Sequence, residues 1–314
     1  MIKHSVVLMG GTHDELRVSA TTLQEAIGAL VDGARKATRF AVEGESVRHG
    51  PRPTWLEAAC AIDITGLSAG SANVAVEAPT LQEADTEKFG DGGQRSFFED
   101  QERLLGGQTA VDLFGKVLAA VVEGPVDDVS ADRALLDTCA RFARTASGAF
   151  TGVQLVGLQG RSTPLLVTPD HVPQIELLRD ETPQPQAVRL SGTLDTISAS
   201  RADVILTLKD GTKIPARLED HDSDVLKELF GTDVVASGVA HFKPSGRLLL
   251  LDVESICAAS KSDQLFETMP TGRRRLPVVT PVGQDATSGV SAFFGTWPGD
   301  ESEQDLLKAL KVIG

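Results

Sequence analysis

The sequence contains no tyrosine, only three cysteines and no apolar run of the roughly 18 residues that a membrane span needs. Cys60, Cys139 and Cys257 lie far apart, without a C-x-x-C pair and without a histidine at metal-ligand spacing. We therefore expect three reduced cysteines that are buried as small apolar side chains. The apolar run near the N-terminus, Val6–Met9, is too short for a secretory signal, which favours a cytoplasmic protein.

Basic charge is also scarce, since 30 lysines and arginines face 44 aspartates and glutamates, giving a net charge of −14. No long segment is basic, so the chain lacks the electrostatic footprint of a dedicated nucleic-acid binder. The one basic cluster is GRRRLP at residues 272–277. It is typical of a solvated linker; its alternative is docking to an acidic surface.

The first 180 residues predict an acidic α+β domain, in which helices cover one face of a sheet. Short segments that alternate apolar and polar residues indicate strands, and apolar residues at helical spacing indicate helices. Thr22 and Glu25 form a T-x-x-E capping pattern at the start of the first helix, and Ser130 offers a cap to a later one. The expected strands are 4–9, 15–19, 61–67, 72–78, 152–158 and 163–168, with 4–9 and 15–19 forming one hairpin and 61–67 and 72–78 another; the expected helices begin at Thr22 and span 109–123, 131–146 and 170–179.

A proline-containing segment at 180–186 predicts a linker, and a second pattern begins after it. Three strands are expected before a short helix and two strands after it, with Asp210-Gly211 as a strong hairpin turn. The expected strands are 188–197, 202–209, 212–218, 233–242 and 247–256, and the expected helix is 222–231.

This β-β-β-α-β-β order resembles the OB-fold, a five-stranded Greek-key barrel, over residues 187–257. Other small barrels of the SH3-like kind fit the same pattern. The resemblance implies a binding face without implying a particular ligand. Residues 1–180 are similar, at most, to bacterial protein families that have no assigned role.

Two short motifs resemble sites of chemistry. GLSAG at residues 66–70 matches the G-x-S-x-G pattern that would make Ser68 a nucleophile, with His171 as an imaginable base. That pattern needs a helix after the serine, whereas SANVAVEA alternates like a strand, so a hairpin turn explains the glycines better. EDHDSD at 219–224 lacks the spacing of a calcium loop and is typical of acids that cap a helix.

No glycine-rich loop fits a phosphate cradle, because the glycines of GDGGQ and LLGGQ do not lie between a strand and a helix. We therefore predict no catalytic residue, no metal ligand and no cofactor.

The C-terminal segment, 258–314, predicts a connector followed by an amphipathic helix that needs a surface to dock on. In outline, FFGTWPGDESEQDLLKAL is similar to the C-terminal ends of bacterial antitoxins, which wrap a toxin partner. The resemblance implies a partner-binding element, and aromatic and apolar side chains are typical anchors in such a groove. The alternative is that the tail folds back on residues 1–180. The predicted partner-binding residues are Phe293, Phe294, Trp297, Leu306, Leu307 and Leu310.

Taken together, the sequence predicts a non-enzymatic, regulatory binding protein whose main partner is another protein, with no membrane contact. The first alternative is an OB-type binder of single-stranded nucleic acid, which aromatic stacking would support only weakly because Phe242 is the one aromatic in the barrel strands. The residues expected to carry such binding are Lys213, Arg217, Lys243 and Arg247, with Lys209 nearby. The second alternative is a serine hydrolase using Ser68.

Overall fold

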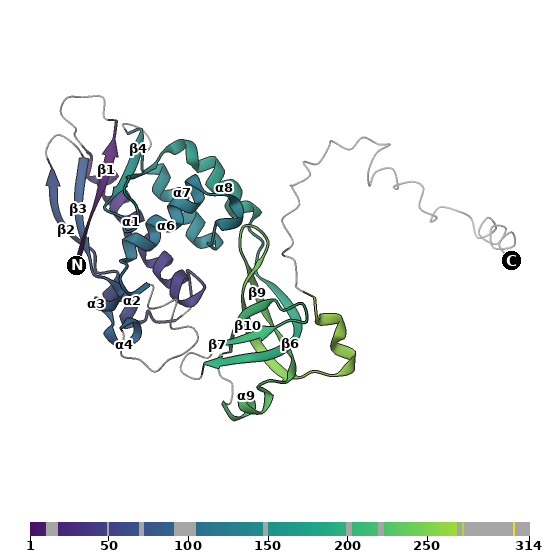
Figure 1. The fold of residues 1–314 in the computed structure, drawn as a ribbon. Helices are drawn as coiled ribbons and strands as arrows, with labels where there is room; N and C mark the ends of the chain where they lie inside the picture. The colour runs from purple at the N-terminus through teal and green to yellow at the C-terminus, as the bar shows by residue number, and fades with distance from the viewer. Residues whose placement is uncertain are drawn as a thin grey trace. The chain divides into compact units, whose positions relative to one another are not determined.

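The computed structural model describes residues 1–10, 18–48, 50–68, 72–90, 105–146, 150–198, 203–218 and 223–268, together with Gly272 and Gln304. One compact unit, Met1–Arg274, contains every helix and strand below (Figure 1). Its first part, Ile2–Glu181, is called the sheet layer here, and its second part, Gln186–Ala258, is called the barrel. The α+β class expected from the sequence is confirmed.

The sheet layer is built on five antiparallel strands in the order β2-β3-β1-β4-β5. The central strand, β1, pairs with β3 on one edge and with β4 on the other. The expected hairpin between residues 4–9 and 15–19 is therefore wrong, because both edges of β1 are already occupied. The five strands are β1 Ile2–Met9, β2 Asp63–Ser68, β3 Ala72–Ala78, β4 Gly152–Val156 and β5 Leu165–Val167.

The predicted hairpin of β2 and β3 is confirmed, with one irregularity. Ile64 lies opposite Val76 and Gly66 lies opposite Ala75, so Thr65 is an extra residue in β2. A bulge of this kind changes which side chains share a face of the sheet. Since the order of the sheet places β2 last, this bulge lies on an edge strand.

The helices cover one face of the sheet and bury the alternate residues His4, Val6 and Leu8 of β1 (Figure 1). Phe114 and Phe142 meet edge to face at 5.5 Å in this core. A Cβ at Gly33 of α1 would lie 2.4 Å from the Phe114 ring, so only glycine allows this approach. The helices are α1 Ala20–Glu43, α2 Thr54–Ala59, α3 Leu81–Ala84, α4 Thr86–Phe89, α6 Ala110–Glu123, α7 Arg133–Arg144 and α8 Val172–Glu181, with short 3₁₀ turns η1 Val126–Asp128 and η2 Pro169–His171.

Two helix starts differ from the expected ones by a few residues. Helix α1 begins at Ala20, and the Ser19 hydroxyl accepts the Thr22 amide at 3.0 Å. Helix α7 begins at Arg133, and Asp132 rather than Ser130 accepts the amide of Leu135 at 2.9 Å. Several residues near each start can cap, and the one whose oxygen reaches the second or third amide of the helix does so.

The barrel is closed, with the strand order β10-β8-β7-β6-β9. Strands β8 and β10 pair in parallel and complete the ring, while the other pairs are antiparallel. This arrangement is compatible with an OB-like barrel. The elements are β6 Gln186–Ser198, β7 Asp203–Thr207, β8 Lys213–Leu218, α9 Ser223–Leu229, β9 Asp233–Phe242 and β10 Leu248–Ala258.

The sheet layer and the barrel have separate apolar cores, which lie on either side of the predicted linker at 180–186. The exact division of the chain into three parts stays a prediction. After β10, the 3₁₀ helix η3, Lys261–Phe266, lies along β6, where the Phe266 ring is 5.3 Å from the Arg189 guanidinium.

Candidate functional site

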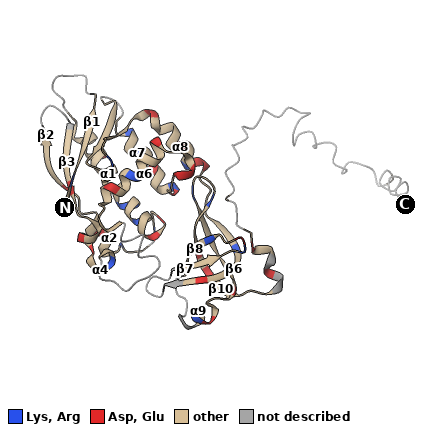
Figure 2. Cartoon of the chain, viewed as in Figure 1, with Lys and Arg blue, Asp and Glu red and all other residues tan. Residues whose placement is uncertain are grey.

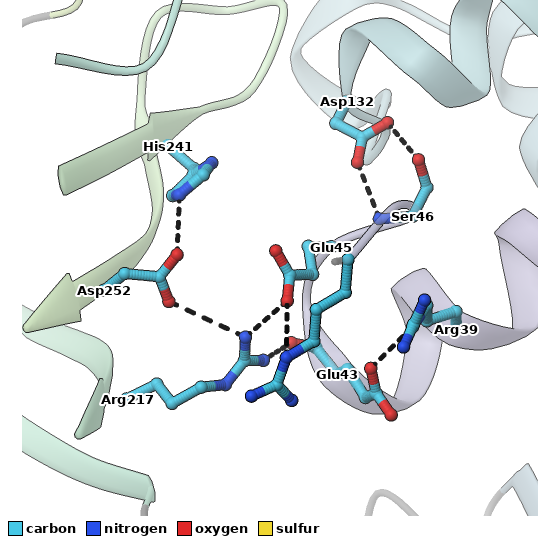
Figure 3. Close-up of polar contacts among 9 residues, drawn as sticks. Arg39, Glu43, Glu45, Ser46, Asp132, Arg217, His241 and Asp252 are labelled. Atoms are coloured by element: carbon cyan, nitrogen blue, oxygen red, sulfur yellow. Dashed lines mark hydrogen bonds and ion pairs between the residues drawn. The ribbon is translucent and has the colours of Figure 1, made fainter. Parts of the chain in front are cut away.

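A group of polar side chains joins the end of α1 to the outer surface of the barrel (Figure 3). Arg217, on β8, donates from Nη1 to Glu45 Oε1 at 2.6 Å and from Nη2 to the carbonyl oxygen of Glu43. The Arg217 side chain is only 7 % exposed and that of Glu45 is 13 % exposed. We call this group the junction; besides Arg217 and Glu45 it contains Arg48, Asp132, His241 and Asp252.

On the barrel side, the junction continues through Asp252 of β10 to His241 of β9. One Asp252 oxygen lies 3.6 Å from Arg217 Nη1, and the other is 2.8 Å from His241 Nε2. This hydrogen bond, together with the charges of Asp252, Glu45 and Asp132, raises the pKa of His241 above its ordinary value. Burial would raise the pKa of Asp252, but the hydrogen bond and charge of His241 and the charges of Arg217 and Arg48 lower it.

On the sheet-layer side, the segment after α1 is held at both ends. Gly44 ends the helix in the left-handed conformation, with φ at 77°, and its amide donates to the Phe40 carbonyl. Ser46 donates to Asp132 from both its amide, at 2.7 Å, and its hydroxyl, at 2.6 Å. Glu45 is therefore presented to Arg217 by a segment whose backbone is fixed on either side.

Apolar contact accompanies these ion pairs. Leu249 of β10 packs against the apolar core of the sheet layer, and a Cβ at Gly44 would lie 3.6 Å from the Leu250 side chain. The junction is thus a packed contact between two parts of one compact unit.

The basic residues predicted for nucleic acid lie on β8, in the turn before it, and at the turn between β9 and β10. Arg217 is in the junction, and Lys213 lies 3.3 Å from Asp195. Lys209 pairs with Glu267 at 2.5 Å. Lys243 and Arg247 lie together at the turn between β9 and β10, where the Lys243 amide donates to the Arg247 carbonyl. Figure 2 shows acidic and basic residues interspersed over the barrel in this view.

The six predicted partner-binding residues lie outside the described residues: Phe293, Phe294, Trp297, Leu306, Leu307 and Leu310. Residues 273–277 of the basic cluster GRRRLP and His221 of the EDHDSD segment also lie outside them. The Ser68 side chain is not described either, but Ser68 is the last residue of β2 and the next described element is strand β3. A nucleophile elbow needs a helix at that position.

A second buried polar group lies in the sheet layer, where α6 begins. Thr109 and Asp112 form a capping box, and the Thr109 hydroxyl lies 3.0 Å from His4 Nε2. Asp112 Oδ2 accepts from Thr109 in this capping box, and Asp112 Oδ1 accepts the Gln159 amide at 2.7 Å. Burial lowers the pKa of His4, and neither the Asp112 charge nor the Gly157 carbonyl offsets this effect.

Two hollows adjoin described elements. A cleft of about 390 Å³ lies between α6 and the β4–β5 connection, with Asp112, Lys116 and Arg161 among its lining residues. Arg161 is held there by two hydrogen bonds of 2.9 Å to Glu123. A smaller hollow of about 230 Å³ lies on the barrel beside Thr193, Asp233 and Lys209.

Edge strand β2 exposes two large apolar side chains. Ile64 is 54 % exposed and Leu67 is 67 % exposed, although they lie opposite Val76 and Val74, which are buried. Residues directly opposite each other in a ladder point to the same side of the sheet. The bulge at Thr65 therefore brings Ile64 and Leu67 to one side, where we call them the edge patch.

The cysteines differ from one another. Burial raises the pKa of Cys60 to about 11 and that of Cys139 to about 12, so both thiols are protonated near neutral pH. Cys257 is exposed, so the expectation that all three are buried is wrong. It stands near the end of β10, beyond the part of that strand that lines the barrel core.

Among the described residues, no group of three or more histidine, cysteine or acidic side chains could hold a metal ion. None of the helices in the described ranges combines the length and the apolar character that a bilayer crossing requires. No protein-family model matches the chain, and no curated protein matches it in sequence.

Sequence reasoning missed the junction and the edge patch for different reasons. Arg217 and Glu45 are 172 residues apart, and no local pattern links them. The edge patch does have a signal in the sequence. The apolar residues on each side of Thr65-Gly66 break the strict alternation that a regular strand would show.

Proposed function

We propose that this chain is a non-enzymatic, intracellular binding or regulatory protein that acts mainly through contact with another protein. The observation that carries the proposal is the edge patch, where Ile64 and Leu67 are more than half exposed on a strand at the end of a sheet. Isolated exposed apolar residues are common, but two on one face of a sheet edge favour protein contact.

The position of the patch favours a partner that is extended along β2. An edge strand offers backbone donors and acceptors to an added strand, and neighbouring side chains then give specificity. The bulge at Thr65 disfavours indiscriminate pairing of the whole edge. Recognition would therefore depend on Ile64 and Leu67 rather than on backbone pairing alone.

The tail supports the same class of function by a separate route. Its similarity to antitoxin C-termini implies a groove on a partner protein, with Phe293, Phe294 and Trp297 as anchors. A tail bound in trans and an edge patch bound in trans are distinguishable, because each can be altered without changing the other.

An OB-type binder of single-stranded nucleic acid is the second candidate, and the closed barrel with its strand order favours it. The second and third strands of such barrels form the ligand face, which corresponds to β7 and β8 here. Arg217 of β8 is engaged by Glu45, so a phosphate would have to replace that carboxylate. This candidate predicts salt-sensitive binding that falls when Lys213, Lys243 and Arg247 are reversed in charge.

The test is capture of partners from nuclease-treated lysate by three forms of the chain. The first is the full chain, the second carries Ile64→Lys and Leu67→Lys, and the third carries Leu177→Lys as a control. Leu177 on α8 is 59 % exposed, which matches the edge patch in exposure.

A partner that binds the full chain and the Leu177 variant but not the double variant supports the proposal. A chain stopped after Arg274, where the compact unit ends, separates the tail from the edge patch. If no protein depends on either the edge patch or the tail, while single-stranded nucleic acid binds with a steep dependence on salt, the second candidate replaces the first.

A further inference from the structure

The junction gathers equal numbers of acidic and basic side chains only when His241 carries a proton. The acids are Glu45, Asp132 and Asp252, and the bases are Arg48, Arg217 and His241 (Figure 3). Arg39 and Glu43 pair with each other at 2.8 Å beside this group and leave its balance unchanged. A neutral His241 leaves the acids in excess.

The charged groups that face His241 come from all the elements packed around it. Asp252 is on β10, Arg217 is on β8, Glu45 and Arg48 follow α1, and Asp132 caps α7. Strand β6 is the other neighbour of β9, and its residues paired nearest His241, Gln186 and Ala187, have no titratable group. Among the six junction residues, His241 is the one histidine, so its proton decides whether their charges balance.

The balance between acidic and basic side chains affects the stability of the contact, because charges in a contact with little water are poorly screened. The side chains of Arg217 and Glu45 are almost covered, and that of His241 is 24 % exposed. Protons can reach the imidazole from solvent without opening the contact, whereas the Glu45 carboxylate, 13 % exposed, lies deeper.

We propose that the junction is a pH-responsive latch, in which protonated His241 helps to hold strands β8–β10 of the barrel against the segment that follows α1. Loss of that proton leaves the acids in excess and loosens the contact between the barrel and the sheet layer. The latch does not rest on the proposed function, and it would apply whichever partner the chain binds.

The sign follows from linkage. A histidine whose folded pKa is raised stabilises the folded contact fully below its unfolded pKa, near 6.5, and this contribution is lost as pH rises through the folded value. The lowered pKa of Asp252 acts in the other direction, with its contribution present above about pH 4 and lost in more acidic solution. The latch is therefore tightest between these limits.

Hydrogen–deuterium exchange of the full chain at about pH 6, below the ordinary histidine pKa, and at about pH 8.5 tests the latch. After correction for chemical exchange rates, we expect amides of Gly44–Arg48 to lose protection several-fold at the higher pH. The Ser46 amide is the most direct reporter, since it donates to Asp132 in the junction. In His241→Gln, which keeps a donor for Asp252 but cannot titrate, the loss should disappear.

His171→Gln is the matched control, because His171 lies in η2, outside the junction, and a glutamine oxygen can still accept the Thr168 amide. This variant should retain the pH dependence. Equal loss of protection in the wild type and in His241→Gln, or no loss in the wild type, overturns the latch.

If His241→Gln fails to fold, the pKa of His241 can be measured directly in the wild type. Titration of the wild type by NMR should give His241 a pKa above its ordinary value, and Asp252→Asn should lower it. An ordinary His241 pKa in the wild type would equally overturn the proposal.

Discussion

Two histidines in this chain lie beside aspartates, yet their pKa values move in opposite directions. His4 is in the core of the sheet layer, with a side chain only 1 % exposed, and its Nδ1 lies 4.0 Å from Asp112. His241 is in the junction, is 24 % exposed, and contacts Asp252 at 2.8 Å. Burial lowers the pKa of His4, whereas the hydrogen bond to Asp252 raises that of His241.

Besides their burial, the two histidines differ in the hydrogen bonds that the neighbouring carboxylate makes. Both oxygens of Asp112 accept from Thr109 and Gln159, and neither accepts a hydrogen bond from the His4 ring. Asp252 offers one oxygen to His241 directly. The pKa of His241 lies above its ordinary value because a carboxylate oxygen accepts from the ring, whereas the pKa of His4 lies below it because burial outweighs the charge of Asp112.

Among the substitutions considered, we expect the largest loss of stability at Asp112. Asp112→Ala removes the acceptor for the buried amide of Thr109 and the part-buried amide of Gln159, and buried donors without partners are costly. We expect the free energy of unfolding to fall by about 3 kcal/mol, measured by urea denaturation.

Asp85→Ala is the matched control for that change. Asp85 also accepts a helix amide, that of Lys88, but it caps a four-residue helix in a less buried position. Its loss should cost less than about 1 kcal/mol. Equal costs at the two caps would show that burial does not set the role of Asp112.

A smaller effect is expected in the junction. Arg217→Met keeps the apolar stem but leaves Glu45 and Asp252 without their guanidinium, so we expect a loss of about 2 kcal/mol. Adding Glu45→Gln should recover part of the loss if repulsion between acids is its cause. A double variant no more stable than Arg217→Met, in the same urea titration, would contradict this explanation.

The smallest expected effects are those of His4 and His241 on the pH dependence of stability, and they should have opposite signs. The lowered pKa of His4 means that its group favours the unfolded chain as pH falls below about 6.5, whereas His241 favours the folded chain in acid. Replacing His4 by Gln should therefore improve stability at about pH 5.5 relative to pH 8, and replacing His241 by Gln should do the reverse. Melting temperatures of both variants across that pH range measure these changes. If stability changed with pH in the same direction in the two variants, the contrast between His4 and His241 would be wrong.

Local patterns were enough to predict much of the fold. The hairpin of β2 and β3, the main helices and the strand order around α9 each depend on neighbouring residues, such as the Asp210-Gly211 turn. The hairpin predicted for residues 4–9 failed because the partners of β1 come from residues 72–78 and 152–156. Pairings at that separation compete with every nearby segment of similar propensity, and local sequence does not rank them.

The junction shows the same limit at the level of a site. Arg217 was predicted, with Lys213, Lys243 and Arg247, as a residue that would carry nucleic-acid binding by the barrel. What covers an outer face is a matter of tertiary packing, and here it is Glu45 from the end of α1. Whether the barrel also binds nucleic acid stays a prediction, as do the roles assigned to the tail.

The central position of β1 in the sheet has a consequence for folding during synthesis. Residues 2–9 leave the ribosome well before their second partner, β4, which is complete only at Val156. At about 5 to 20 residues per second, the apolar side of β1 waits on the order of ten seconds for that neighbour. Val6 and Leu8, the most deeply covered part of the finished strand, are thus the part of β1 that a nascent chain most needs to keep from other polypeptides.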